Sequence, residues 1–272
     1  MIKINEMRCK RDGICVQECP LSIIKQTEKK AIPEMVSGGR NVCLLCGHCV
    51  AVCPHGAMSH DATPLDQSLP INKELVINKE QAVQFLRSRR SVRVYKNKTV
   101  EKEVIAELIN LARYAPTGSN SQLVEWRVFT SEEDLKTISS MTVDWLREAV
   151  KNPPKEGIMP YIPLIVAAWD AGYDRILRDA PALIIASTPG DYRNGLVDLS
   201  IALSYLELVA VPMGLGTCWA GICRQAVDNY KPLQEFVGLS EDAQQYPMML
   251  GYPKFRYHRL PERKVPKIIW KV

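Results

Sequence analysis

Seven of the nine cysteines in the chain lie in residues 9–53, and their spacing constrains the fold more than any other feature. An offset of 34 residues aligns the segment with itself. It places Cys9 on Cys43, Gly13 on Gly47, Cys15 on Cys49, Cys19 on Cys53 and Pro20 on Pro54. The N-terminal segment is therefore a twofold internal repeat.

The second copy of the repeat has the spacing of an iron-sulfur ligand loop. It reads Cys43-x2-Cys46-x2-Cys49-x3-Cys53-Pro54, in which three close thiolates bind one cubane and the fourth cysteine reaches another cluster. Residues 1–60 thus resemble the two-cluster bacterial ferredoxins. The resemblance implies that one 4Fe-4S cluster is held by Cys19, Cys43, Cys46 and Cys49 (cluster site 2), and the other cluster by Cys9, Cys15 and Cys53 (cluster site 1).

One ligand position departs from that pattern. The offset sets Asp12 opposite Cys46, so the first copy lacks its second cysteine. A carboxylate is a harder ligand than a thiolate and binds a soft iron-sulfide corner less firmly. We therefore expect cluster site 1 to hold either a 4Fe-4S cluster with Asp12 as a ligand or a 3Fe-4S cluster, with a shifted potential in both cases.

A structural zinc site is the alternative for these cysteines. Zinc ribbons usually pair two separated C-x2-C knuckles. The run from Cys43 to Cys53 crowds four thiols into one loop, which favours clusters over zinc.

The segment after the repeat predicts a domain boundary. Residues 61–80 lack clear periodicity and contain two prolines, so we expect a linker between a domain at 1–60 and a larger domain at 81–272. A helix is predicted from Lys79 to Ser88, with Asn78 as its cap and Gln81 as the capping-box partner.

A basic segment opens the larger domain. Residues 87–93 read Arg-Ser-Arg-Arg-Ser-Val-Arg, and planar guanidinium donors with a hydroxyl among them suit a phosphate monoester. Taken alone, the cluster fits a solvated basic face equally well, and nucleic-acid contact is a third, weaker alternative.

Two helices and a polar loop are predicted downstream. The first helix has Thr99 as its N-cap and carries its apolar face on Val104, Leu108, Leu111 and Ala112. It ends in a loop over residues 115–122, Ala-Pro-Thr-Gly-Ser-Asn-Ser-Gln, whose small polar groups suit a flat heteroaromatic ligand as well as an ordinary turn. Residues 198–210 predict a buried helix, and Cys218 and Cys223 are expected to be packed thiols.

The order of these features resembles the nitroreductase family of FMN enzymes from about residue 81 to the C-terminus. The segments 214–221, Gly-Leu-Gly-Thr-Cys-Trp-Ala-Gly, and 251–253, Gly-Tyr-Pro, match the family as well. The resemblance implies an α+β fold, a mainly antiparallel sheet flanked by helices, and a homodimer with FMN at its interface. Residues Phe255–Val272 are expected to form an extended arm.

The same resemblance implies roles for particular residues. Arg89, Arg90, Ser91 and Arg93 would bind the FMN phosphate, with Arg263 opposite them. Pro116, Thr117, Gly118 and Asn120 would meet the isoalloxazine, typically from the partner subunit. Trp219, Ala220 and Gly221 belong to the segment whose backbone amides would face flavin N5 and O4. No side chain is predicted as a proton donor, so the chemistry is expected to be flavin-based.

Composition and charge exclude several other classes of protein. The opening Met1–Asn5 has no apolar signal core, and Glu207, Pro212 and two glycines interrupt the most apolar stretch. We therefore expect a cytoplasmic protein with reduced thiols and no membrane span. A net charge of +5 and a pI of about 8.7 are only mildly basic, which is weak evidence for a nucleic-acid partner.

The sequence therefore predicts an iron-sulfur flavoprotein oxidoreductase. Electrons would pass through the clusters to FMN, which reduces a small conjugated acceptor such as a nitroarene, quinone or enone. An external ferredoxin, a flavodoxin or NAD(P)H would be the donor. Reverse flow, from NAD(P)H or a reduced substrate through FMN to the clusters and a protein acceptor, is the first alternative. A zinc- and nucleic-acid-binding protein is the alternative of another class.

Overall fold

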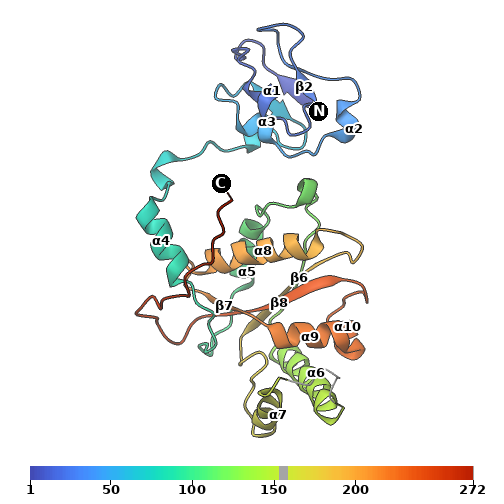
Figure 1. Ribbon diagram of the computed structural model, residues 1–272, viewed down its shortest axis with the longest axis vertical. Coiled ribbons are helices and arrows are strands. Elements are labelled where there is room, and N and C mark those ends of the chain that lie inside the picture. The colour runs from blue at the N-terminus through green and yellow to red at the C-terminus, as the bar shows by residue number, and fades with distance from the viewer. Residues whose placement is uncertain (153–158, 272) are drawn as a thin grey trace. The chain divides into compact units, whose positions relative to one another are not determined.

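The computed structural model describes residues 1–152 and 159–271. Its contacts divide the chain into two compact units, whose elements are labelled in Figure 1. Unit 1 comprises Met1–Ile77 and Gly118–Ser121, and unit 2 comprises Asn78–Thr117 and Gln122–Val272.

Unit 1 is built from short elements joined by turns. Its strands form two separate antiparallel pairs, β1 with β4 and β2 with β3. The elements are β1 (Ile2–Ile4), α1 (Ile14–Glu18), β2 (Ile24–Lys25), β3 (Glu34–Met35), α2 (Gly39–Val42), α3 (His48–Ala51), β4 (Met58–His60), and the 3-10 turns η1 (Leu65–Gln67) and η2 (Lys73–Leu75). The buried apolar cluster of this unit is small and centres on Cys15, Val50 and Met58.

The internal repeat of the sequence is also a repeat of the backbone. Arg11 and Leu45, which are 34 residues apart, both have positive φ angles, 57° and 54°. Gly13 and Gly47 follow with φ angles of 74° and 72°, and they are the N-caps of α1 and α3. Because a left-handed conformation is unfavourable for residues other than glycine, its recurrence at the same offset means that both copies form the same turn.

Unit 2 contains a four-stranded antiparallel sheet in the order β5-β6-β8-β7. The strands are β5 (Glu125–Phe129), β6 (Ala182–Thr188), β7 (Gly216–Trp219) and β8 (Gln244–Gly251), and the helices are α4 (Lys79–Ser88), α5 (Lys102–Ala112), α6 (Glu132–Lys151), α7 (Ile162–Asp170), α8 (Gly195–Ala210), α9 (Gly221–Asn229) and α10 (Lys231–Phe236). The predicted α+β fold is confirmed.

Helices cover both faces of this sheet (Figure 1). Successive side chains of a strand point to opposite faces. Leu183 and Ile185 of β6 accordingly pack with α6 and α9, whereas Ala182, Ile184 and Ala186 pack with α5 and α8. All seven residues of β6 are buried, because the strand lies at the centre of three layers.

The basic segment that follows α4 lies between β7 and the turn after β8. Val92 N–H donates to Thr217 O, and Lys96 N–H donates to Tyr252 O, both at 2.8 Å. A side chain on Gly216 would clash with the side chain of Val92, so glycine is needed for this close approach. Three segments that are distant in the sequence are thereby brought together.

The predicted helix boundaries are right for α4 and wrong for α5. The capping box of α4 is present, since Asn78 and Gln81 exchange two hydrogen bonds of 2.9 Å. Helix α5 begins at Lys102 with Glu101 as N-cap, so Thr99 is not its cap. The Glu101 carboxylate is bound by Tyr252 Oη at 2.7 Å, a tertiary contact that holds the chain extended past Thr99.

The apolar face of α5 also differs from the prediction in two positions, Ile105 and Leu111. Ile105, Leu108 and Ala112 are buried, whereas Leu111 is 36% exposed. The spacing of the three buried residues places them on one side of the helix.

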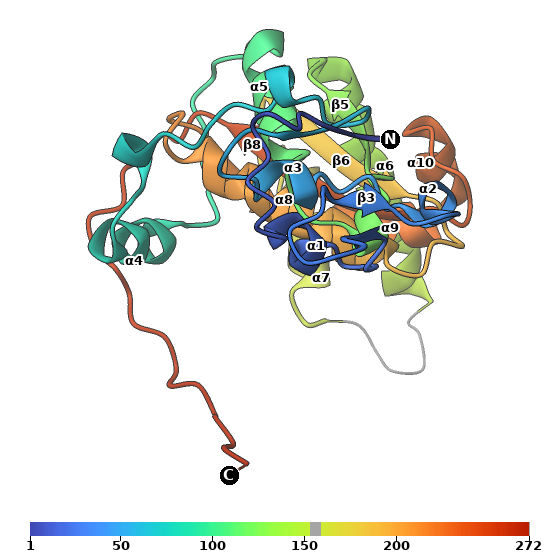
Figure 2. The same cartoon turned by 90° about the horizontal axis from the view of Figure 1, so that it is seen from above.

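The C-terminal arm leaves the sheet without forming a helix or strand (Figure 2). The prediction covered Phe255–Val272, of which Val272 lies outside the described residues. Glu262 of the arm pairs with Arg87 of α4 at 3.3 Å. Over residues 1–152 and 159–271, every helix is too short or too polar to cross a bilayer.

Candidate functional sites

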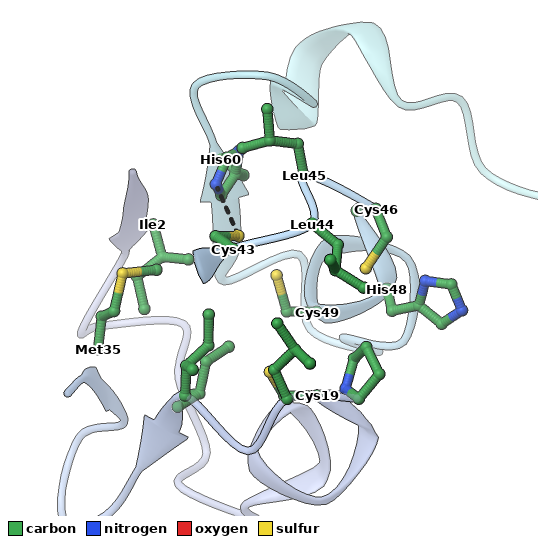
Figure 3. A pocket seen from close by; sticks show the side chains of 15 residues that line it. Ile2, Cys19, Met35, Cys43, Leu44, Leu45, Cys46, His48, Cys49 and His60 are labelled. Atoms are coloured by element: carbon green, nitrogen blue, oxygen red, sulfur yellow. Dashed lines mark hydrogen bonds between the residues drawn. The ribbon is translucent and has the colours of Figure 1, made fainter. Parts of the chain in front are cut away.

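Four cysteines, one directly after α1 and three from the segment that leads into α3, line one pocket of unit 1. They are the residues predicted for cluster site 2: Cys19, Cys43, Cys46 and Cys49 (Figure 3). Apolar side chains, among them Ile2, Ile24 and Met35, complete the wall of the pocket. Such a wall keeps water away from a bound group and strengthens the electrostatic effect of nearby dipoles.

His60 provides an imidazole at the edge of this pocket. It ends β4, is 4% exposed, and its Nε2 lies 3.9 Å from Cys43 Sγ (Figure 3). Burial lowers the pKa of the His60 imidazole, and the N-terminal ammonium lowers it further. The ring is therefore neutral at pH 7.

A second pocket contains the residues predicted for cluster site 1. Its lining includes Cys9, Asp12, Cys15 and Cys53, together with Lys10 and His55. Each ligand set that the ferredoxin resemblance implied thus lines its own pocket, and Asp12 lines the same pocket as its three cysteines.

Both carboxylate oxygens of Asp12 already have partners in the protein. Oδ1 accepts a hydrogen bond from Ile14 N–H at 3.2 Å, at the start of α1. Oδ2 lies 3.3 Å from His55 Nε2. Asp12 therefore stabilises the turn that presents Cys15, whether or not it also binds iron.

The backbone around the pockets fits anionic clusters. The left-handed residues Leu45 and Gly47 lie between ligand cysteines, and such turns direct successive N–H groups into one concavity, a feature of many iron-sulfur sites. Ala57 N–H donates to Cys53 Sγ at 3.4 Å. Burial raises the pKa of the Cys49 thiol to about 11, and a bound metal displaces such a proton.

The ligand side chains are spread around each pocket. Within the residues that the structure describes, no three His, Cys, Asp or Glu side chains converge as the ligands of a single metal ion do. The four ligands of a cubane bind separate corners instead, which suits the pocket-wide arrangement of the cysteines.

In unit 2, the basic segment is anchored by a buried carboxylate. Arg89 Nη1 donates to Glu207 Oε1 at 2.9 Å. Glu207 is 7% exposed on α8, and it also accepts hydrogen bonds from Thr217 Oγ1 at 3.4 Å and Trp219 Nε1 at 3.3 Å. Arg89 has five donors, so this pair leaves others for a ligand.

Other cations gather beside Ser91. Arg93 lies close to Arg178 and Cys218, and burial followed by repulsion from Arg93 lowers the pKa of Arg178. Two guanidinium groups held close together favour an anion as their ligand. Cys218 and Cys223 are buried, as predicted.

The segment from Trp219 to Gly221 joins β7 to α9. The Ala220 N–H donates to Pro247 O at 3.0 Å, so the sheet already uses this amide. Gly221 is the first residue of α9, where N–H groups have no partner within the helix. Of the two amides predicted to face a flavin, Gly221 is the better placed to donate.

The polar loop divides between the two units. Pro116 and Thr117 belong to unit 2, and Thr117 Oγ1 accepts from Gln122 N–H at 3.1 Å. Gly118 and Asn120 belong to unit 1, where Asn120 Nδ2 donates to Leu44 O at 3.0 Å. The prediction that this loop contacts an isoalloxazine stays a prediction.

The arm contacts the basic segment through Tyr257 and Glu262, and the role of Arg263 stays a prediction. The Arg90 guanidinium lies 5.9 Å from the centre of the Tyr257 ring. Arg263 follows Glu262, the partner of Arg87, and is exposed.

The family of the chain follows from comparison with known proteins. The model of the nitroreductase family matches residues 86–252, and that of the 4Fe-4S dicluster domain matches residues 7–58. The chain belongs to the nitroreductase family and carries a dicluster ferredoxin domain before it. The expectation of an FMN-dependent oxidoreductase of the nitroreductase type is confirmed.

Individual relatives are distant. An Archaeoglobus fulgidus protein, provisionally named NADH dehydrogenase/NAD(P)H nitroreductase, is 24% identical over 180 residues, which cover 64% of this chain and 86% of the relative. A Bacteroides fragilis nitroreductase with bound FMN is 18% identical, with a TM-score of 0.58 over 71% of this chain and 100% of its own. A Desulfitobacterium hafniense nitroreductase with bound FMN is 19% identical, with a TM-score of 0.54 over 71% and 100%. The structural matches show a shared fold.

Sequence reasoning missed three residues that shape these sites. Glu207 and His60 each contact a predicted site residue, and Arg178 lies within electrostatic range of Arg93. A signal existed for Glu207, because it is the one charged side chain between Leu199 and Ala210. No motif marked Arg178 or His60.

Loss of the Glu207 carboxylate should destabilise unit 2 by about 3 kcal/mol, because the partly buried donors of Arg89 and Trp219 Nε1 would lose their acceptor. We expect this loss for Glu207→Leu in urea denaturation of the full chain. Glu207→Gln keeps an acceptor oxygen and should lose clearly less. A second substitution, Arg89→Met, should recover stability in the Glu207→Leu variant. Equal losses of stability in Glu207→Leu and Glu207→Gln would contradict the role of the Glu207 oxygen as an acceptor.

Proposed function

We propose that this protein is an iron-sulfur flavoprotein that carries electrons through two clusters to FMN and reduces a small conjugated acceptor such as a nitroarene, quinone or enone. One observation carries the proposal: each predicted ligand set lines its own pocket in a chain whose larger part belongs to the nitroreductase family. Iron-sulfur clusters exchange single electrons, and a flavin can accept electrons one at a time, so the clusters can reduce the flavin.

For the clusters, we propose a 4Fe-4S cluster at Cys19, Cys43, Cys46 and Cys49 and a 3Fe-4S cluster at Cys9, Cys15 and Cys53. The four thiols and the apolar wall of the first pocket support the former. The latter is supported by the two protein partners of Asp12, whose oxygens stabilise the turn. A 4Fe-4S cluster with Asp12 as its fourth ligand is the alternative for site 1.

For FMN, the donor set of the basic segment fits the phosphate. Arg90, Ser91 and Arg93 offer guanidinium and hydroxyl donors, and Arg178 adds a cation beside Arg93. Arg89, while paired with Glu207, would donate its remaining N–H groups to the phosphate. Arg263 of the C-terminal arm would be a further cation for the phosphate. When bound, FMN accepts electrons singly and delivers hydride to an acceptor.

The residues of the chain would orient the flavin and stabilise charge that develops on it. The N–H of Gly221 at the start of α9 would donate to a flavin carbonyl, as oxyanion-type donors do. Trp219 is fixed by Glu207 and by edge-to-face packing on Tyr246, with 4.7 Å between ring centres. Both groups are held before the ligand binds, which reduces the cost of binding.

We propose a homodimer on the basis of α8. The helix has apolar residues on all sides, and Leu196, Val197 and Tyr205 are 41%, 60% and 40% exposed. An all-round apolar helix is normally buried, so a second copy would cover this side. In the dimer, Pro116, Thr117, Gly118 and Asn120 would reach the flavin of the partner subunit.

The reverse direction of flow is the second candidate function. The Archaeoglobus fulgidus relative, whose name includes NADH dehydrogenase, supports a pyridine nucleotide as donor. FMN would then be reduced first, and the clusters would pass electrons to a protein acceptor. The alternative of another class, a zinc- and nucleic-acid-binding protein, predicts colourless protein whose affinity falls steeply with salt, and the matches to the nitroreductase family and the 4Fe-4S dicluster domain speak against it.

Anaerobic reduction separates these functions. The purified dimer, with a mass twice 30.6 kDa, is analysed for iron, sulfide and FMN and then treated in turn with NADH, NADPH and reduced ferredoxin. We expect reduced ferredoxin to reduce the clusters before it reduces the flavin. EPR detects the reduction of the clusters, and optical absorption detects that of the flavin. If pyridine nucleotide alone reduces the flavin and the clusters follow, the direction is reversed. Zinc in place of iron would exclude both.

Arg93→Gln should weaken FMN binding by about tenfold or more and leave riboflavin binding unchanged, because only FMN has the phosphate. A charge-assisted hydrogen bond contributes about 1.5–3 kcal/mol, and 1.4 kcal/mol corresponds to tenfold. Quenching of flavin fluorescence measures both affinities. Arg113→Gln, at the exposed end of α5, is the control and should change neither affinity. An equal loss for both flavins would contradict a phosphate contact.

Asp12→Cys should raise the iron content by one atom per chain, because a thiolate would complete the ligand set of a 3Fe-4S cluster. Asp12→Asn keeps the acceptor for Ile14 N–H and should leave the iron content unchanged. Iron analysis with EPR of the oxidised protein measures both variants. If Asp12 binds iron instead, Asp12→Cys would leave the count unchanged and Asp12→Asn would lower it by one atom.

A further inference from the structure

The ring of His60 is held in one place beside cluster site 2. His60 pairs with Ile2 at the end of the β1–β4 sheet. The next residue, Asp61, binds the N-terminal ammonium at 2.7 Å and Lys3 Nζ at 2.8 Å. His60 and Thr63 close the turn that follows as an isolated β-bridge. The backbone before and after His60 is therefore fixed.

The hydrogen bonds of His60 define which nitrogen carries its proton. Ala62 N–H points at His60 Nδ1 at 3.0 Å. A backbone N–H can only donate, so Nδ1 is the acceptor, and in the neutral ring the proton must be on Nε2. Nε2 is the atom that lies 3.9 Å from Cys43 Sγ (Figure 3), so its N–H faces the sulfur.

The first copy of the repeat lacks this arrangement. The offset of 34 residues sets Gln26 opposite His60. Gln26 Nε2 donates to Ala31 O at 2.7 Å and to Arg11 O at 3.2 Å, so its donors serve the backbone. The N–H at a ligand sulfur thus distinguishes cluster site 2 from cluster site 1.

We propose that His60 is a positioning residue that donates Nε2–H to the Cys43 thiolate and raises the reduction potential of the cluster at site 2. The proposal rests on the proposed function, in which Cys43 is a cluster ligand. A reduced cluster carries one more negative charge than the oxidised cluster, and a hydrogen bond to a ligand sulfur stabilises the more negative state. In a pocket with apolar walls, this dipole acts at close range without competition from water.

Three variants of the full-length protein test the proposal. His60→Leu removes the donor and should shift the midpoint potential of the site 2 cluster to a more negative value, by about 59 mV for a tenfold change in a one-electron equilibrium. His60→Gln keeps an N–H near the position of Nε2 and should recover most of the shift. His48→Leu removes an exposed imidazole beside the same cysteines and should leave the potential unchanged. Potentials are measured by anaerobic titration with EPR detection.

The outcomes separate this inference from the proposed function. Unchanged potential in His60→Leu, with both clusters present, overturns the role of His60 and leaves the function intact. Purified parent protein without iron overturns both. If His60→Leu loses its cluster, two other measurements decide: the nitrogen NMR spectrum of the parent protein and the potential of His60→Gln. A parent spectrum with the His60 proton on Nδ1 would overturn the proposal. A parent spectrum with the proton on Nε2, together with a potential of His60→Gln near that of the parent, would support it.

Discussion

The candidate site of the larger unit depends on the hydrogen bonds that the buried carboxylate of Glu207 accepts. This carboxylate accepts from Arg89, Thr217 and Trp219, so one side chain joins α8, the basic segment and β7. A buried carboxylate without partners is costly, and α8 can therefore pack on the sheet only with these donors in place. Burial of α8 and the position of the basic segment are thus a single constraint.

The smaller unit relies on turns more than on a core. Its buried apolar cluster centres on three residues, which is little for an independent domain of this size. The left-handed turns at Leu45 and Gly47 instead fix the path of the chain between ligand cysteines. Metal-ligand bonds contribute folding free energy wherever the ligands are not preformed in the unfolded chain, so assembly of the proposed clusters and folding of this unit are expected to be coupled.

The residues that sequence reasoning identified are those whose chemistry is local. The cysteines lie within one short repeat, and the ferredoxin resemblance that their spacing carries implies two ligand sets, each of which lines its own pocket. Contacts between distant residues gave no such signal. Glu207 meets Arg89 across 118 positions, and the contact of Glu101 with Tyr252, across 151 positions, moved the start of α5 away from Thr99.

The repeat is most informative where its copies differ. Asp12 stands opposite Cys46, and Gln26 stands opposite His60. Two identical halves would hold two clusters of nearly equal potential, and electrons would have no preferred direction between them. With the clusters proposed above, each difference would act on a separate cluster: the Asp12 position would change the iron coordination at site 1, and His60 would add an N–H at the sulfur of Cys43 in site 2. Because hydrogen bonds, net charge and ligand type all set cluster potentials, substitutions at these two positions would let a duplicated sequence set a potential difference while the shared cysteine pattern stays intact.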